Sequence, residues 1–365
     1  MSALFRIAGF IPFLVMIFLN AFVDLGHKII IQNTIFKIYD EQTQVILTAI
    51  VNGLILLPFV LLFTPAGFLA DRFRKPRVMQ ISAMVAVALT LMITAAYYAG
   101  WFDVAFGMTF LLAVQSAFYS PAKYGYIREL TGKSRLAAAN AAVQACTIVA
   151  ILSGIFFFSI LFEWALASTV YSTKAEIMQI IAPLGWVLVV CSLFELVAAF
   201  RLPMLVGADS GFSSSSSANS KLGTPFNWQR YVSGQSLRSN LSMLRSTRGI
   251  WLSIIGLSVF WAISQVVLAT YPAFAKETLA ITNTVVIQGL LACAGIGIVI
   301  GSLLASRVSA RHIETGLIPV GALGVVITLA LLPQLESLPL LALDILFFGL
   351  CGGLFIIPLN ALIQF

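Results

Sequence analysis

Ten apolar stretches, each long enough to cross a bilayer, dominate this sequence. A spanning helix needs about 20 mostly apolar residues, because lipid offers no partner to an unpaired backbone N–H or C=O. The chain has 365 residues, 60% of them hydrophobic and only 10% charged, whereas about a quarter of the residues in a soluble domain are charged. We therefore predict an all-α integral membrane protein with helices over Phe10–Ile35, Thr43–Pro65, Val78–Tyr98, Val104–Ala122, Ala139–Leu161, Gln179–Arg201, Gly249–Tyr271, Thr282–Ser306, Thr315–Pro333 and Leu340–Leu362.

The placement of positive charge predicts the orientation of these helices. If the N-terminus is cytoplasmic, the inner segments hold 17 of the 21 Lys and Arg residues, and the outer loops hold only Lys37, Lys174 and Lys276. An excess of Lys and Arg in cytoplasmic loops is typical of inserted membrane proteins. The net charge of +7 is therefore explained by topology, and we expect no nucleic-acid partner. The first apolar run carries Asp24 and Lys28 and has no small-residue cleavage site, so we expect no cleavable signal peptide.

A polar segment divides the chain into two groups of helices. We expect a six-helix half over residues 1–201, a cytoplasmic linker over 202–248 and a four-helix half over 249–365. The serine-rich centre of the linker is typical of a flexible chain. Its basic end, Asn227–Arg248, contains Trp228 and several leucines, which fits either a short helix on the membrane surface or a disordered loop.

A charged cluster, Gly67–Arg77, separates the second and third apolar runs. Its pattern G-x-x-x-D-R-x-x-(K/R)-x-(K/R) resembles the loop between helices 2 and 3 of the major facilitator superfamily, although Arg74 stands where that family usually has Gly. The resemblance implies a fold of twelve helices in two repeated halves, with ten present here, so we expect the sequence to be C-terminally truncated. It also implies a conformational switch, for which we expect Gly67, Asp71, Arg72 and Arg77.

Four polar side chains follow one another in the first helix: Asn20, Asp24, His27 and Lys28. Their spacing of three and four residues places them along one face. Charge inside a bilayer is costly, so these groups need a partner or a cavity. Asp24 and Lys28 either pair with each other or line a substrate cavity, where Asp24 meets a cationic headgroup. His27 either titrates in proton coupling or is a hydrogen-bonded packing residue.

Polar residues on other helices extend this candidate site. Gln115, Tyr119 and Lys123 repeat at intervals of four on the fourth helix, where Pro121 predicts a kink. Lys123 either attracts a phosphate or extends to the membrane surface. The further candidates are Asn140 and Gln144, with Thr147, on the fifth helix and Trp261 and Gln265, with Ser264, on the seventh.

Other intramembrane residues have simpler readings. Glu195 needs a partner or a wet cavity, whereas Asp344 lies near an outer helix end. Gly295, Gly297 and Gly301 predict close helix packing. The four cysteines show no metal-ligand spacing, and we expect neither a metal nor a cofactor.

Four segments give a narrower resemblance. They are Asn20–Asp24, Tyr119–Gly125, Phe260–Trp261 and Pro358–Leu362, and they are similar to segments of the bacterial lysophospholipid transporter family. The stretch Asp24–Thr34 is especially similar to a branch that is fused to acyltransferase and acyl-carrier-protein ligase domains. The resemblance implies a transporter of the inner membrane that moves lysophosphatidylethanolamine from the outer to the inner leaflet for reacylation, with those domains as partners. The resemblance also implies that Asp24 and Lys123 contact the lipid headgroup, because both residues and their flanking segments match the family.

The same resemblance has limits. Single-domain members have an arginine in the seventh helix, where this chain has Leu268 nearby, and a glutamate after the last matched segment, where it has Gln364. Two other functions stay open from the sequence: a proton-coupled exporter of small amphiphiles that uses Asp24 and His27, and a membrane anchor for acyltransferases that transports nothing. A membrane enzyme is disfavoured, because no nucleophile–base pair stands out.

Overall fold

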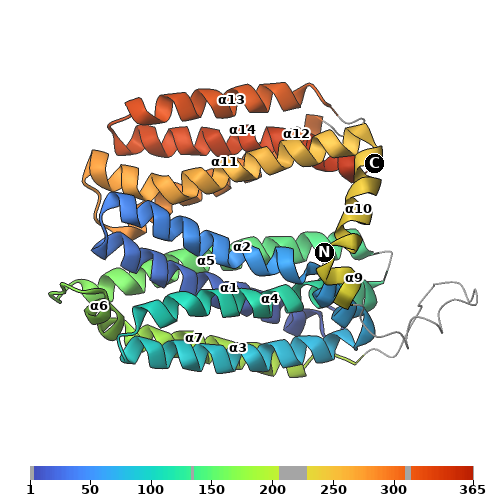
Figure 1. Ribbon diagram of the computed structural model, residues 1–365, viewed down its shortest axis with the longest axis horizontal. Helices are drawn as coiled ribbons and strands as arrows, with labels where there is room; N and C mark the ends of the chain where they lie inside the picture. Colours follow the sequence, from blue (N-terminus) through green and yellow to red (C-terminus); the bar gives the residue numbers. More distant parts are fainter. Residues whose placement is uncertain (1–3, 133–134, 205–227, 309–313, 365) are drawn as a thin grey trace, which may run out of the picture. The chain divides into compact units, whose positions relative to one another are not determined.

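The structure is a computed structural model that describes residues 4–132, 135–204, 228–308 and 314–364. Ten of its helices are long and apolar enough to span a membrane, which confirms the ten-span prediction (Figure 1). They are α1 (Phe10–Ile38), α2 (Glu41–Arg72), α3 (Lys75–Tyr98), α4 (Phe102–Thr131), α5 (Leu136–Leu166), α7 (Ala182–Phe200), α11 (Arg248–Leu279), α12 (Thr284–Val308), α13 (Leu317–Leu331), which reaches this length together with the short helix that follows it, and α14 (Leu338–Gln364). The short helices are α6 (Lys174–Ile180), α9 (Trp228–Val232), α10 (Gln235–Ser246) and η2 (Leu332–Gln334).

The start predicted for the sixth span, at Gln179, is wrong. Gln179 belongs to α6, and α7 begins after Ile181 with Pro183 in its first turn. Proline fits there because it fixes the helical φ and its missing N–H has no intrahelical acceptor at that position. A capping box opens α6: Thr173 accepts from the backbone N–H of Glu176, and Glu176 accepts from that of Thr173. The backbone N–H of Ser172 also donates to Glu176 and lowers the pKa of its carboxyl.

The helices extend further into the charged segments than their apolar runs predict. Gly67, Asp71 and Arg72 lie in the last turns of α2, and only Phe73 and Arg74 separate it from α3. The predicted charged loop is therefore a two-residue turn. Similarly, α4 continues through Pro121 to Thr131, so proline does not end it. Charged side chains at helix ends reach water while their backbone groups stay paired within the helix.

The chain folds into two compact units. The first comprises Met1–Ile38 and Ile50–Asn227, and the second comprises Tyr39–Ala49 and Trp228–Phe365. In the first unit, α1 packs against α4, α5 and α7, while α3 packs against α4 and α7. Gly154 allows α5 to approach α1 closely, because a Cβ there would lie 3.2 Å from the Phe22 carbonyl oxygen. The division into residues 1–201, 202–248 and 249–365 stays a prediction.

Reciprocal glycine contacts hold α12 and α14 together in the second unit. A Cβ at Gly297 or Gly301 of α12 would collide with the backbone of Leu346 or Leu350 of α14. In return, a Cβ at Gly349 would collide with the backbone of Ala294. Close packing at Gly297 and Gly301 is therefore confirmed. No described atom lies within 4 Å of a Cβ placed at Gly295, so the same prediction is wrong there.

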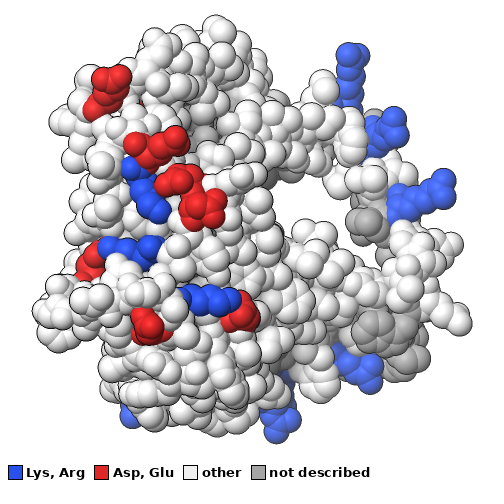
Figure 2. Space-filling model, turned by 60° about the vertical axis from the view of Figure 1, so that its left-hand side comes forward, with Lys and Arg blue, Asp and Glu red and all other residues white. Residues whose placement is uncertain are grey.

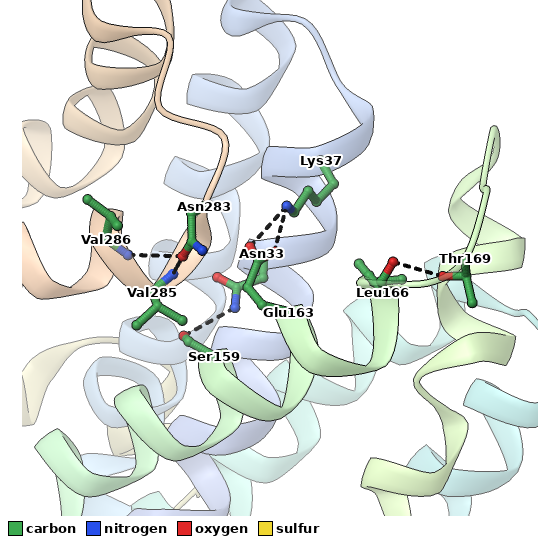
Figure 3. A network of polar contacts seen from close by, with 9 residues as sticks. All are labelled: Asn33, Lys37, Ser159, Glu163, Leu166, Thr169, Asn283, Val285 and Val286. Atoms are coloured by element: carbon green, nitrogen blue, oxygen red, sulfur yellow. Dashed lines mark hydrogen bonds and ion pairs between the residues drawn. The ribbon is translucent and has the colours of Figure 1, made fainter.

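The three lysines of the predicted outer loops all lie beside a carboxylate. Lys37 pairs with Glu163 at 2.9 Å, and Lys174 pairs with Asp103 at 2.7 Å. In the second unit, Lys276 lies 3.9 Å from Glu41 and donates to the Tyr39 carbonyl oxygen. Figure 3 shows Lys37 and Glu163 joining α1 to α5, one turn beyond the Asn33–Ser159 hydrogen bond. Basic and acidic side chains also lie side by side on the surface seen in Figure 2.

The basic segment after the linker contains α10, a helix that leaves Leu241 and Leu244 exposed beside Arg238 and Arg245. Helix formation was one of the two outcomes expected for this segment. Its position on a membrane surface stays a prediction. The serine-rich centre of the linker lies outside the described residues.

Candidate substrate-binding site

The candidate site in the first unit is built around Asp24, near the middle of α1. Its carboxylate accepts a hydrogen bond from the Ser116 hydroxyl of α4. Next to Ser116, Gln115 donates through Nε2 to Ser82 of α3, at 2.7 Å to Oγ and 3.2 Å to the carbonyl oxygen. Gln115, Ser116 and Ser82 are buried. Asp24 is therefore held by a polar chain that links α1, α4 and α3.

Lys123 supplies the positive charge of this site. It lies two turns after Ser116 on α4, is half-buried and interacts electrostatically with Asp24. Its Nζ also lies 4.7 Å from the ring centroid of Tyr124 and 5.7 Å from that of Tyr119. Aromatic faces attract a cation without neutralising it. Lys123 therefore remains able to attract an anion, while Asp24 can attract a cation.

The alternative of an Asp24–Lys28 ion pair is wrong. Neither an ion pair nor a hydrogen bond joins Lys28 to another side chain in the part of the chain that the structure describes. Lys28 is half-buried on α1. Although the two residues are four positions apart, Asp24 is held by Ser116 of α4.

His27 connects three helices within the interior of the first unit. Its side chain is completely buried, with Nδ1 2.7 Å from the Tyr97 hydroxyl and Nε2 3.0 Å from the Ala105 carbonyl oxygen. The Thr109 hydroxyl lies 3.3 Å from Nε2. Because a carbonyl only accepts, we assign the ring hydrogen to Nε2, so that Tyr97 donates to Nδ1. These contacts match the hydrogen-bonded packing role.

A second carboxyl group, Glu195, lies close to Asp24. It belongs to α7, is fully buried, and interacts with the Asn20 side chain and electrostatically with Asp24. Tyr119 interacts with both carboxyl groups, and its hydroxyl is buried. The structure therefore brings Asn20, Asp24, Tyr119 and Glu195 together from α1, α4 and α7. The sequence marked Glu195 only as needing a partner.

An apolar cavity of about 820 Å³ adjoins this polar chain. Most of its lining is aliphatic or aromatic side chains of α2, α3 and α4, with Arg77 at the first turn of α3. Ser82 and Gln115 are among its few polar lining residues. A cavity with apolar walls and a few polar groups is suited to an amphiphile. Ser82 was not predicted, although a hydroxyl inside an apolar helix was a signal for it.

The other sequence candidates belong to α5 of the first unit and to the second unit. Asn140 and Gln144 of α5 are exposed, and Thr147 donates to the Val143 carbonyl oxygen of its own helix. In the second unit, Trp261 is half-exposed beside the Phe260 ring, and Gln265 is half-buried. Their role in substrate binding stays a prediction.

The predicted switch residues lie at the adjoining ends of α2 and α3. Asp71 and Arg77 are exposed, and Arg72 lies over the Phe68 ring at 5.8 Å. The N-cap residue of α3, Arg74, makes no side-chain capping hydrogen bond, and Asp71 forms no ion pair among the described residues. A fixed contact in this region is instead made by Lys75 of α3 with Glu129 of α4.

A family model and individual relatives both match this chain over most of its length. The family model of the Major Facilitator Superfamily matches residues 4–365. The chain is 30% identical over 339 residues to the lysophospholipid transporter LplT of Yersinia pestis, strain Pestoides F, which covers 90% of this chain and 71% of that protein. It is 29% identical over 334 residues to LplT of Yersinia enterocolitica, with the same coverage.

Solved structures show the same fold. A bacterial homologue of the human lysosomal transporter Spinster gives a TM-score of 0.67 at 12% identity, over 97% of this chain and 74% of that one. The nucleoside transporter NupG gives 0.57 at 15% identity, over 95% and 80%. The chain therefore belongs to the major facilitator superfamily and, within it, to the family of the lysophospholipid transporter LplT.

Proposed function

We propose that this protein is a flippase of the bacterial inner membrane that carries lysophosphatidylethanolamine-like lipids from the outer to the inner leaflet. The N-terminus is cytoplasmic in this proposal, and the two halves of the fold expose the site alternately to each side. The lipids delivered to the inner leaflet are substrates for partner acyltransferase and acyl-carrier-protein ligase activities. No bond is broken during transport, so we assign no catalytic residues.

The observation that carries this proposal is a buried polar cluster that contains two opposite charges, Asp24 and Lys123, and whose Gln115 also lines an apolar cavity. Asp24 and Lys123 present a carboxylate and an ammonium group from neighbouring helices. A zwitterionic headgroup offers an ammonium group to the first and a phosphate to the second. The apolar walls that adjoin Gln115 and Ser82 suit a single acyl chain. The names of the relatives support the same class of substrate.

The proposal is tested with the purified chain in liposomes. Labelled lysophosphatidylethanolamine is placed in one leaflet, and its appearance in the other is followed with the wild type, Asp24→Asn, Lys123→Ala and the surface control Asp103→Asn. We expect saturable movement in the wild type and the control and its loss in the two site variants. Absence of movement in a folded wild type would contradict the proposal and favour the membrane-anchor function.

A further inference from the structure

Glu195 is a buried carboxyl group that the proposed headgroup contacts leave without a role. It lies in the middle of α7, its side chain is completely buried, and both carboxyl oxygens lack a hydrogen-bond partner of standard geometry among the described residues. An ionised carboxylate in such surroundings is costly, because it loses its hydration and has only the Asn20 amide as a neighbouring donor in the described part of the chain. A protonated carboxyl group avoids most of this cost.

Polar and titratable side chains reach the surroundings of Glu195 from α1, α4, α5 and α7. From α1 come the Asn20 side chain and the Asp24 carboxylate, and from α4 comes Tyr119. On α7 itself, Cys191 interacts electrostatically with Glu195. On α5, Cys146 interacts electrostatically with Tyr119. At the neighbouring end of α7, Gln80 of α3 donates to the Ala199 carbonyl oxygen and brings no charge.

The charges of this cluster do not balance if both carboxyl groups are ionised. Asp24 has a hydrogen-bond donor in Ser116 and a nearby cation in Lys123. Glu195 has the Asp24 charge beside it instead. Two carboxylates that share a site hold a proton between them, since the second ionisation works against the first charge. Asp24 is half-buried and has this donor and this cation nearby, whereas Glu195 is completely buried, so we assign the proton to Glu195.

We propose that Glu195 and Asp24 form a proton-binding site in which Glu195 holds one exchangeable proton and Asp24 carries the charge. As an acid, Glu195 gains an O–H donor, for which the Asn20 amide oxygen and the Tyr119 hydroxyl oxygen are the neighbouring acceptors. On release, the Glu195 O–H bond breaks and the proton passes to water. The ligand is a proton, and the site stands whether or not the transported molecule is a lysophospholipid.

Infrared difference spectroscopy of the purified full chain in lipid nanodiscs tests this site without any substrate. A pH titration records the C=O stretching band of protonated carboxyl groups. We expect a band that disappears as the pH is raised and that is missing in Glu195→Gln. It should persist in the matched control Glu163→Gln, because Glu163 is paired with Lys37. Asp24→Asn should change the pH at which the band disappears.

A second variant separates loss of the proton from loss of folding. Glu195→Asp keeps the carboxyl group, so it should shift the band in frequency without removing it, and thermal unfolding of each variant is measured in parallel. The proposal is overturned if the Glu195→Gln spectrum retains the band, or if Asp24→Asn leaves its titration unchanged. Loss of the band on replacing potassium by sodium at constant pH would also overturn it, since the ligand would then be a metal cation.

Discussion

Ser116 of α4 donates its hydroxyl hydrogen to the Asp24 carboxylate of α1, so the most costly charge of the first helix is held by a neighbouring helix. A charge-assisted hydrogen bond of this kind contributes about 1.5–3 kcal/mol. It fixes the orientation of the carboxylate without cancelling its charge. The carboxylate that we propose to contact a cationic headgroup is therefore held in position by the protein itself.

Removing this hydrogen bond should weaken transport without abolishing it. Ser116→Ala leaves the Asp24 charge in place but frees its side chain, so we expect apparent substrate affinity to fall roughly tenfold, the equivalent of about 1.4 kcal/mol. Concentration-dependent uptake of labelled lysophosphatidylethanolamine measures this. Ser153→Ala is the matched control, because the Ser153 hydroxyl donates to the Ala150 carbonyl oxygen of its own helix. Equal loss in both variants would mean that any serine-to-alanine change in the bundle has this effect.

Removing either headgroup contact should have a larger effect. Loss of one member of a buried charge contact costs on the order of 2–5 kcal/mol, so Asp24→Ala and Lys123→Ala should each reduce uptake by about 30-fold or more. Insertion and yield of each variant are measured beside uptake. Adding Lys28→Ala to Asp24→Ala should not restore transport, because Lys28 does not pair with Asp24. Restoration would show that the two residues balance each other and that the headgroup assignment is wrong.

His27→Ala should act on stability first. It leaves the Tyr97 hydroxyl and the Ala105 carbonyl oxygen without their partner, and each unpaired buried group costs about 1–3 kcal/mol. We expect a clear fall in the midpoint of thermal unfolding in detergent. His27→Gln restores part of the hydrogen bonding and should recover part of that loss. A normal unfolding midpoint combined with a changed pH profile of transport would instead assign His27 to proton coupling.

Asp71→Asn should shift the balance between inward-open and outward-open states. Asp71 is exposed at the end of α2, close to the start of α3, so we predict that it contacts the N-terminus of α3 in only one of the two states. Contacts of an exposed carboxylate with a helix N-terminus contribute about 0.3–1 kcal/mol, which changes a population ratio by up to roughly fivefold. Labelling of single cysteines from each side measures the ratio. Unchanged labelling and unchanged transport in this variant would show that Asp71 has no role in the conformational switch.

Two exposed positions test the topology. Val170 lies between α5 and α6 and is 96% exposed, whereas Arg74 lies exposed between α2 and α3. In a background with the four native cysteines replaced, Val170→Cys should react with an impermeant reagent in intact cells. Arg74→Cys should react only after the cells are opened. The reverse labelling pattern would show that the predicted orientation is wrong and that the N-terminus lies outside the cytoplasm.

The length of the apolar runs was enough to predict the ten spans, because a bilayer imposes a minimum length on each helix. It could not place the break between α6 and α7, since apolar residues continue across Ile181. The Thr173–Glu176 pair, with its capping-box spacing, was a signal for that start. Helical spacing placed Asn20, Asp24 and Lys28 on one face, but it could not choose their partners. Ser116 lies 92 residues beyond Asp24, and Tyr97 lies 70 residues beyond His27, so those contacts depend on tertiary packing.

The reciprocal glycines of α12 and α14 have a mechanical consequence. The backbone of α14 packs directly against Gly297 and Gly301, and the backbone of α12 packs directly against Gly349. The two helices therefore interlock at these glycine positions. If one helix slid along the other, the carbonyl oxygens that now face these glycines would collide with the side chains of neighbouring residues. The packing therefore opposes shear between α12 and α14. We expect the two helices to move as one rigid body when the second unit changes conformation.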